Sequence, residues 1–177
     1  LVEDFIKTIL NNKINFFTGV PDSVLKKLSL NLDNLSKYRH IIATNEGSAI
    51  ALASGYYLST KRPAAVYMQN SGLGNAINPL ISLAHHKVYS IPMLLIIGWR
   101  GSPYLKKDEP QHIVQGEITA SMLKLLNIRT CVIRNKKNLQ QLSKLISYSK
   151  KKNRPVACLI ENGTLIKKKY YEKSINK

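Results

Sequence analysis

The chain has 177 residues, of which 44% are hydrophobic and 21% are charged. This composition is typical of one globular domain, and it excludes an intrinsically disordered chain. The longest nearly uncharged apolar run, residues 88–99, is shorter than the ~20 residues that cross a bilayer, so we expect no membrane segment.

The formal net charge of +17 raises the question of nucleic-acid binding. The lysines, however, are spread over predicted helix faces and gather only at residues 150–152 and 167–169. No RNP, zinc-finger or helix-turn-helix pattern accompanies them. We therefore expect no nucleic-acid partner, and the basic excess instead favours the binding of small anions.

The sequence also bears on the cellular compartment. No basic flank followed by an apolar block opens it, so we expect no signal peptide. The two cysteines, Cys131 and Cys158, both lie inside apolar, strand-like runs. We interpret them as buried thiols in a reducing compartment rather than as a disulfide or a metal site. The expected location is the cytoplasm.

Short apolar runs alternate with amphipathic segments, which predicts an α/β fold. We expect a doubly wound, mostly parallel six-stranded sheet with helices on both faces. The expected strands are residues 14–18, 40–43, 64–68, 92–97, 129–133 and 155–160. The expected helices are residues 1–10, 22–32, 46–58, 75–84, 114–126 and 139–149. Residues 1–166 form one domain in this interpretation, and the basic tail 167–177 is expected to fray.

Polar or glycine-rich segments follow four of the predicted strands. In an open parallel sheet, ligands bind beyond the carboxyl ends of the strands, so we expect these segments to converge there. Residues 98–111 form a long irregular stretch of the kind that is usually functional. No Walker sequence, complete G-x-G-x-x-G or G-x-S-x-G pattern is present. The four segments are residues 19–23, 44–47, 69–72 and 98–101.

Two carboxylates in these segments admit a structural and a functional interpretation. Glu46 begins a helix that carries no charge over residues 48–55. It either stabilises the helix dipole by ~0.3–1 kcal/mol or, in this apolar setting, handles protons near neutral pH. Asp22 is expected to cap the helix that begins there, or to move a proton at a reacting carbon.

Five runs stand out together: residues 16–23 (FFTGVPDS), 45–49 (NEGSA), 69–75 (QNSGLGN), 98–101 (GWRG) and 108–112 (DEPQH). They resemble the pyrimidine-binding domain of the thiamine-diphosphate-dependent decarboxylases, in detail over residues 16–128. The last two runs are most similar to the branch of that family that decarboxylates 3-phosphonopyruvate, and next to the branch that decarboxylates sulfopyruvate. The resemblance implies a carboxy-lyase that releases carbon dioxide and phosphonoacetaldehyde or sulfoacetaldehyde.

The resemblance also implies roles for individual residues. Glu46 matches the glutamate that hydrogen-bonds a ring nitrogen of the cofactor and so promotes deprotonation of its thiazolium carbon. Arg100 is expected to hold the phosphonate or sulfonate through its planar fork, with a surface arginine as the alternative. Asp22 and His112 are expected to contact substrate and to move protons. The remaining cofactor contacts are expected at Gln69, Asn70, Ser71 and Gly72.

The family also requires a diphosphate-binding half, which carries a Gly-Asp-Gly block that holds magnesium. This sequence has no Gly-Asp-Gly, so we expect no metal ligands in the chain and assign the magnesium to a partner domain or β subunit. We expect an oligomer that pairs through the helix beginning at Glu46, because the surface of that helix carries small, uncharged residues. A non-catalytic partner-binding module of the same fold is the alternative.

Overall fold

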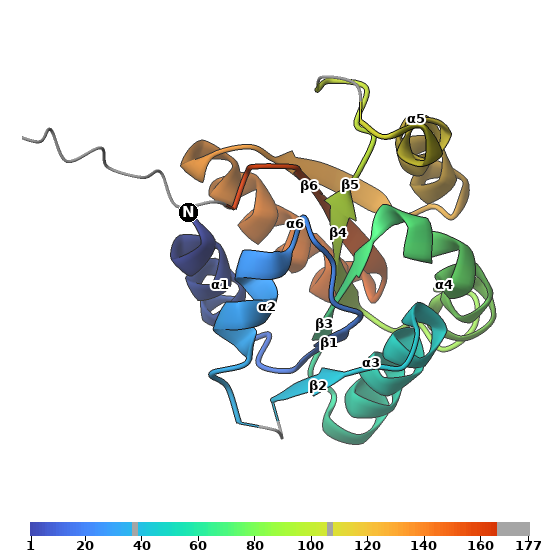
Figure 1. The fold of residues 1–177 in the computed structure, drawn as a ribbon. Coiled ribbons are helices and arrows are strands. Elements are labelled where there is room, and N and C mark those ends of the chain that lie inside the picture. The colour runs from blue at the N-terminus through green and yellow to red at the C-terminus, as the bar shows by residue number, and fades with distance from the viewer. Residues whose placement is uncertain (37–38, 106–107, 166–177) are drawn as a thin grey trace, which may run out of the picture.

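A sheet of six parallel strands forms the centre of the computed structural model, which describes residues 1–36, 39–105 and 108–165 (Figure 1). The strand order β2-β1-β3-β4-β6-β5 places β3 and β4 in the middle. The predicted α/β fold is confirmed, and all five strand pairings are parallel. The strands are β1 (Phe17–Gly19), β2 (His40–Ile42), β3 (Ala64–Gln69), β4 (Met93–Trp99), β5 (Arg129–Ile133) and β6 (Pro155–Glu161).

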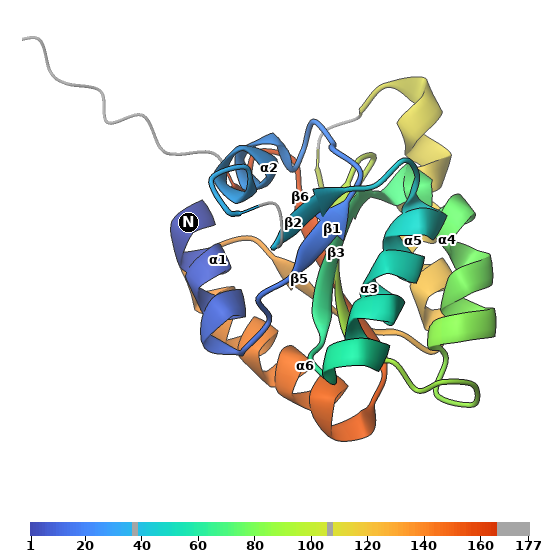
Figure 2. The same ribbon diagram turned by 90° about the horizontal axis from the view of Figure 1, so that it is seen from below.

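Helices cover both faces of the sheet, as expected (Figure 2). Helices α1, α2 and α6 pack on one face, and α3, α4 and α5 pack on the other. Side chains alternate between the faces along a strand, so that Tyr67 joins the first core while Val66 and Met68 join the second. The helices are α1 (Val2–Asn11), α2 (Lys26–Leu32), α3 (Glu46–Thr60), α4 (Leu73–Pro79), α5 (Pro110–Leu125) and α6 (Leu139–Lys152).

Three helix starts differ by two residues or more from the sequence prediction. Helix α5 begins at Pro110 instead of residue 114, because a proline is favourable in the first helical turn. Helix α4 begins at Leu73, directly after the 3₁₀ helix η1 (Asn70–Gly72), where a loop was expected. Helix α2 begins at Lys26 rather than at Asp22, and Leu25 is its N-cap. The Asp22 carboxylate instead accepts the Leu25 N–H at 3.1 Å across the preceding turn.

Smaller differences concern strand ends and the end of α4. Strand β1 begins at Phe17 rather than at the predicted residue 14. Residues 14–16 are buried or half-buried but lie outside the strand. Strand β4 continues to Trp99, so that the irregular stretch after it is shorter than predicted. A π-helical segment, η2 (Leu80–Ala84), follows α4. The basic tail predicted at residues 167–177 lies outside the described residues.

The two cysteines are free thiols that face each other in register across β5 and β6. Cys158 is buried, as the sequence predicted, whereas Cys131, predicted to be buried, is half-buried. Burial raises the pKa of the Cys131 thiol to about 11. None of the helices in the described part of the chain has the length and apolar character needed to cross a membrane.

Candidate active site at the carboxyl edge of the sheet

The predicted site residues follow the carboxyl ends of four strands. Because β1, β3 and β4 are parallel neighbours, with Gly19 opposite Tyr67 and Gln69 opposite Gly98, their ends meet at one edge. The turn after β1 carries Asp22, η1 after β3 carries Asn70, and the loop after β4 carries Arg100. The topology therefore gathers these segments at the edge where ligands of parallel sheets bind.

One part of this edge, here called the Glu46 corner, consists of Glu46, Gly72 and Asn75. Asn45 caps α3 by accepting the Ser48 N–H at 2.8 Å, which fixes Glu46 as the first helical residue. Asn75 Nδ2 donates to Glu46 Oε2 at 2.9 Å. A Cβ at Gly72 would overlap the Glu46 carboxylate where it now lies, so glycine at this position lets the acid pack against η1.

The Asn70 side chain connects η1, after β3, with the loop after β4. Its side chain is buried, with Nδ2 donating to the Arg100 carbonyl and to Thr119 Oγ1, both at 3.0 Å. Its Oδ1 accepts the Arg100 N–H at 3.1 Å. The amide thus ties the end of β3 to the end of β4 and to α5. These hydrogen bonds occupy both ends of the Asn70 amide. The cofactor contact that the sequence predicts for Asn70 stays a prediction.

A second part of the edge, the Arg100 corner, consists of Ser23, Arg100 and Asp108. Arg100 Nε donates to Asp108 Oδ2 at 2.7 Å and Nη2 donates to Oδ1 at 2.6 Å, a two-point ion pair. Arg100 Nη1 lies 3.3 Å from Ser23 Oγ. The hydrogen bonds from Arg100 hold the pKa of the Asp108 carboxyl well below its usual range. The same pairing raises the pKa of the guanidinium.

Asp22 lies beside the Arg100 corner against the backbone of β4. A Cβ at Gly98 would overlap the Asp22 carboxylate, so glycine at this position lets the acid pack on the strand. Asp22 Oδ1 is buried and has no hydrogen-bond partner within the described residues. Burial raises the pKa of Asp22, and backbone N–H groups and the Arg100 charge oppose that rise. This carboxyl is therefore easier to protonate than an ordinary aspartate.

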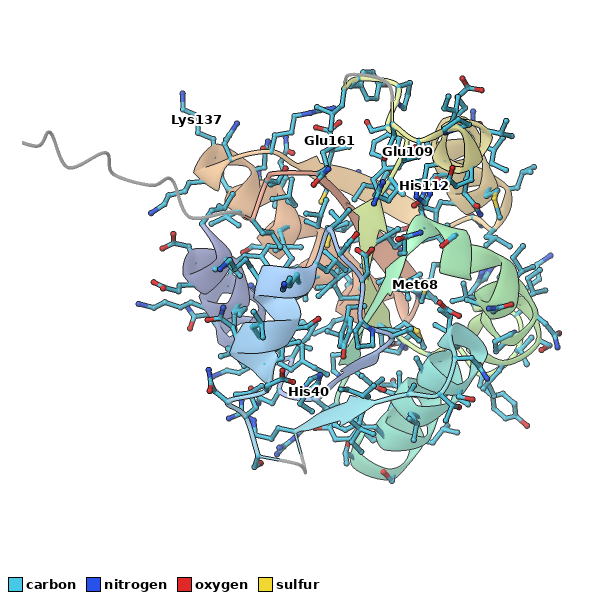
Figure 3. The ribbon with its side chains drawn as sticks, in the orientation of Figure 1. His40, Met68, Glu109, His112, Lys137 and Glu161 are labelled. Atoms are coloured by element: carbon cyan, nitrogen blue, oxygen red, sulfur yellow. The ribbon has the colours of Figure 1, made fainter. Side chains whose placement is uncertain are left out.

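Three other predicted residues lie near η1 and α5. Gln69 Nε2 donates to Ser71 Oγ at 2.7 Å, and Ser71 is exposed. His112 lies in the first turn of α5, where the sequence placed it in the loop, and it is half-buried. Figure 3 shows His112 and Glu109 at the start of α5, and it shows Glu161 near the end of β6.

Sequence reasoning gave no individual role to Asp108, Asn75, Thr119 or Ser23, although Ser23 lies in a segment that was expected at this edge. Asp108 and Asn75 stand inside runs that resemble the decarboxylase domain, and this was a usable signal. Thr119 carried none, because its contact with Asn70 joins residues 49 positions apart.

The Glu46 corner fits an aminopyrimidine ring. Asn75 is the hydrogen-bond partner of Glu46 within the described residues, on Oε2, and the Glu46 side chain is half-exposed. This leaves Oε1 for a ring nitrogen of a ligand. Within the same described residues, no group of three or more His, Cys, Asp or Glu side chains is placed to hold a metal ion.

Comparison with protein families gives one match that covers most of the chain. Residues 1–123 match the family "Thiamine pyrophosphate enzyme, N-terminal TPP binding domain". A phosphonopyruvate decarboxylase of Streptomyces viridochromogenes is 38% identical over 73% of the chain and 32% of its own length. The chain thus spans about a third of that relative.

Shorter relatives match over more of their length. The sulfopyruvate decarboxylase subunit alpha of Methanococcus maripaludis is 39% identical over 71% of the chain and 72% of its own length. That of Methanocaldococcus jannaschii is 36% identical over 85% of the chain and 87% of its own length. Among solved structures, benzoylformate decarboxylase of Polynucleobacter necessarius shares the fold. It has a TM-score of 0.69 at 16% identity, over 91% of the chain and 29% of that structure.

Proposed function

The chain belongs to the thiamine pyrophosphate enzymes, whose N-terminal cofactor-binding domain it contains, and from this premise we propose that it supplies the pyrimidine-binding half of a 2-oxo acid decarboxylase. The proposed substrate is 3-phosphonopyruvate, with phosphonoacetaldehyde and carbon dioxide as products. One observation carries the proposal: a half-exposed carboxylate, Glu46, and a cation, Arg100, flank the same segment η1. A cofactor and an anionic substrate therefore have adjacent binding groups.

The residues of the chain divide the work between cofactor and substrate. Glu46 would hold the aminopyrimidine ring by a hydrogen bond to a ring nitrogen, and Asn75 keeps its carboxylate in place. Gly72 gives the ring access, because a side chain there would cover the acid. The bound cofactor supplies the electron sink for the loss of carbon dioxide.

Substrate binding is assigned to the other side of η1. The positive charge of Arg100 attracts the terminal phosphonate, whose oxygens accept hydrogen bonds from it. Asp22, whose pKa is raised by burial, is assigned the transfer of a proton to the reacting carbon. His112, at the start of α5, stays a candidate for the same proton step.

The proposed active assembly includes a diphosphate-binding half with magnesium. The sequence lacks a Gly-Asp-Gly block, and a diphosphate without a metal ion leaves most of its charge unanchored. Exposed apolar side chains on α3 and η2 support docking of the diphosphate-binding half on the face of the domain that these two helices form. They are Leu52, Leu58 and Ile81.

A second substrate, sulfopyruvate, is favoured by one observation. Two relatives named as sulfopyruvate decarboxylase subunits alpha match the chain over 72% and 87% of their own length. A sulfonate carries one negative charge and a phosphonate carries up to two. The Arg100 corner accommodates both, so charge alone does not choose between them.

Reconstitution tests the proposal. The chain is combined with its diphosphate-binding partner, thiamine diphosphate and magnesium, and kcat/KM is measured for 3-phosphonopyruvate, sulfopyruvate and pyruvate. We expect 3-phosphonopyruvate to give the highest value. A higher value for sulfopyruvate assigns the chain to the second substrate, and no turnover of any 2-oxo acid rejects the decarboxylase.

A further inference from the structure

The Arg100 side chain presents only part of its five N–H donors to the site. Nε and Nη2, which form the edge that pairs best with two-oxygen anions, both donate to Asp108. The two distances, 2.7 and 2.6 Å, are those of strong charge-assisted hydrogen bonds. An incoming phosphonate or sulfonate therefore meets the remaining side of the guanidinium.

The Nη1 side of the Arg100 guanidinium lies next to the turn after β1. Nη1 lies 3.3 Å from the Ser23 hydroxyl, in the turn after β1. The charge of Arg100 also acts on Asp22, one residue before Ser23. The side of Arg100 that remains for a ligand thus faces the β1 turn, where the substrate-side carboxylate lies.

Asp108 is itself held in place, which makes it a fixed anchor. Its Oδ2 accepts the Gly101 N–H and its Oδ1 accepts the Glu109 N–H, both at 2.9 Å. The Arg100 and Asp108 side chains are only 19% and 17% exposed. A long arginine side chain loses rotamer freedom when a ligand fixes it, and an anchored partner removes that cost in advance.

We propose that Asp108 is the positioning residue of the anion site: it fixes Arg100 so that Nη1, together with the Ser23 hydroxyl, forms a cradle for the terminal phosphonate or sulfonate of the substrate. The proposal rests on the proposed function for the identity of the anion. It assigns a role to Asp108 and Ser23, which the sequence prediction left without one. It also restricts the predicted anion contact of Arg100 to the donors that Asp108 does not hold, those on the Nη1 side of the guanidinium.

The test uses the assembled enzyme and a probe that cannot react. The probe 3-phosphonopropanoate has the phosphonate and carboxylate of the substrate but no ketone, so its affinity, measured by isothermal titration calorimetry, reports the anion site without turnover. We expect Asp108→Asn to weaken binding about tenfold or more, because the guanidinium is no longer fixed. Asp108→Glu keeps the charge on a longer side chain, and we expect it to restore part of the affinity.

Glu109→Gln is the matched control. It removes the same charge at the adjacent residue, which is exposed and forms no side-chain cap at the start of α5. We expect its affinity to change less than about threefold. Ser23→Ala tests the other half of the cradle without disturbing the ion pair, and we expect it to weaken binding about threefold to tenfold.

Turnover gives a second and separate readout. Asp108→Asn is expected to raise KM for 3-phosphonopyruvate about tenfold with kcat nearly unchanged, and to leave KM for pyruvate within about threefold. Equal effects of Asp108→Asn and Glu109→Gln would overturn the proposal, because charge alone would then explain them. Tighter probe binding by Asp108→Asn would also overturn it, because Asp108 would then compete with the anion. An Asp108-dependent probe site in an enzyme that decarboxylates no 2-oxo acid would reject the function and keep the anion site.

Discussion

Glu46 and Arg100 lie on either side of the same short segment, η1, and their charged groups have opposite kinds of partner: a neutral amide for Glu46 and a carboxylate for Arg100. The Glu46 carboxylate has one neutral hydrogen-bond partner within the described residues, Asn75, and a glycine beside it. The Arg100 guanidinium donates from all three of its nitrogens, two of them to a fixed carboxylate. The Glu46 carboxylate keeps one oxygen without a partner in the described residues, whereas the Arg100 guanidinium is fixed by an ion pair and keeps only its remaining N–H donors for a ligand.

These different partners indicate how the Glu46 carboxylate and the Arg100 guanidinium are expected to act. A carboxylate that must exchange hydrogen bonds with a cofactor ring benefits from a weak, neutral neighbour, because a strong ion pair would compete with the ring. A cation that must recognise a charged group at one position benefits from being immobilised before the substrate arrives. Each corner is therefore expected to fail differently when its central residue is changed.

The largest effect is expected at the Glu46 corner. Glu46→Gln keeps the size of the side chain but removes its acid function, so we expect kcat to fall about a hundredfold or more in the assembled enzyme. Stability is expected to change by less than about 1 kcal/mol, because Glu46 is half-exposed. Steady-state kinetics and thermal unfolding measure the two quantities. Wild-type turnover by this variant would remove Glu46 from the mechanism.

The Arg100 corner is expected to affect substrate choice more than turnover. Arg100→Ala removes a charge-assisted contact and should raise KM for 3-phosphonopyruvate about tenfold to a hundredfold. KM for pyruvate, which lacks the terminal anion, should change far less. Arg100→Lys keeps the charge but cannot pair with Asp108 at two points, so we expect partial recovery. Equal losses for both substrates would show that Arg100 supports the loop rather than the anion.

Asn70 and Asn75 allow the buried link between the two corners to be compared with an exposed hydrogen bond. Asn70→Ala leaves the Arg100 backbone groups and Thr119 Oγ1 without their partner in a buried place, so we expect a loss of about 2 kcal/mol of unfolding free energy. Asn75→Ala is the same change at an exposed residue, and we expect a loss below about 0.5 kcal/mol. Urea unfolding measures both. Similar losses in the two variants would show that Asn70 does not join the corners.

Parts of this architecture were accessible from the sequence because they depend on local pattern. The runs that became β3, β4 and β6 are continuously apolar, as strands buried on both faces must be. The predicted start of α3 at Glu46 is confirmed, and in the structure Asn45 caps it. Parallel topology then placed the residues after these strands at one edge, which is why the candidate site could be predicted in outline.

The parts that escaped prediction depend on tertiary contacts. The partner of Arg100 is a carboxylate eight positions away across an irregular loop, and no periodic pattern reports such a pairing. The role of Asn70 depends on Thr119 in α5, far away in the sequence. The start of α5 was placed too late, because residues 110–113 were left outside the predicted helix. The fold was thus predicted better than the contacts that tune the site.

The smallest effect concerns acid stability and isolates the Arg100–Asp108 pair from the rest of the site. The pKa of the Asp108 carboxyl is lowered in the folded chain relative to an unfolded value near ~3.9. A lowered folded pKa means that the pair stabilises the fold fully above the unfolded pKa. That stabilisation is lost as the pH falls from about 5 through the unfolded value toward the folded one. At pH 7 we expect Asp108→Asn to be less stable than the parent chain by about 1 kcal/mol, which suits a two-point pair near the surface. The difference in Tm between the two proteins should therefore shrink between pH 7 and pH 3, whereas Glu109→Gln should follow the parent chain throughout. A Tm difference that stays constant across this range would mean that the variant loses a backbone hydrogen bond, because asparagine has a single side-chain acceptor oxygen where Asp108 uses two, and that the charge of the ion pair contributes little.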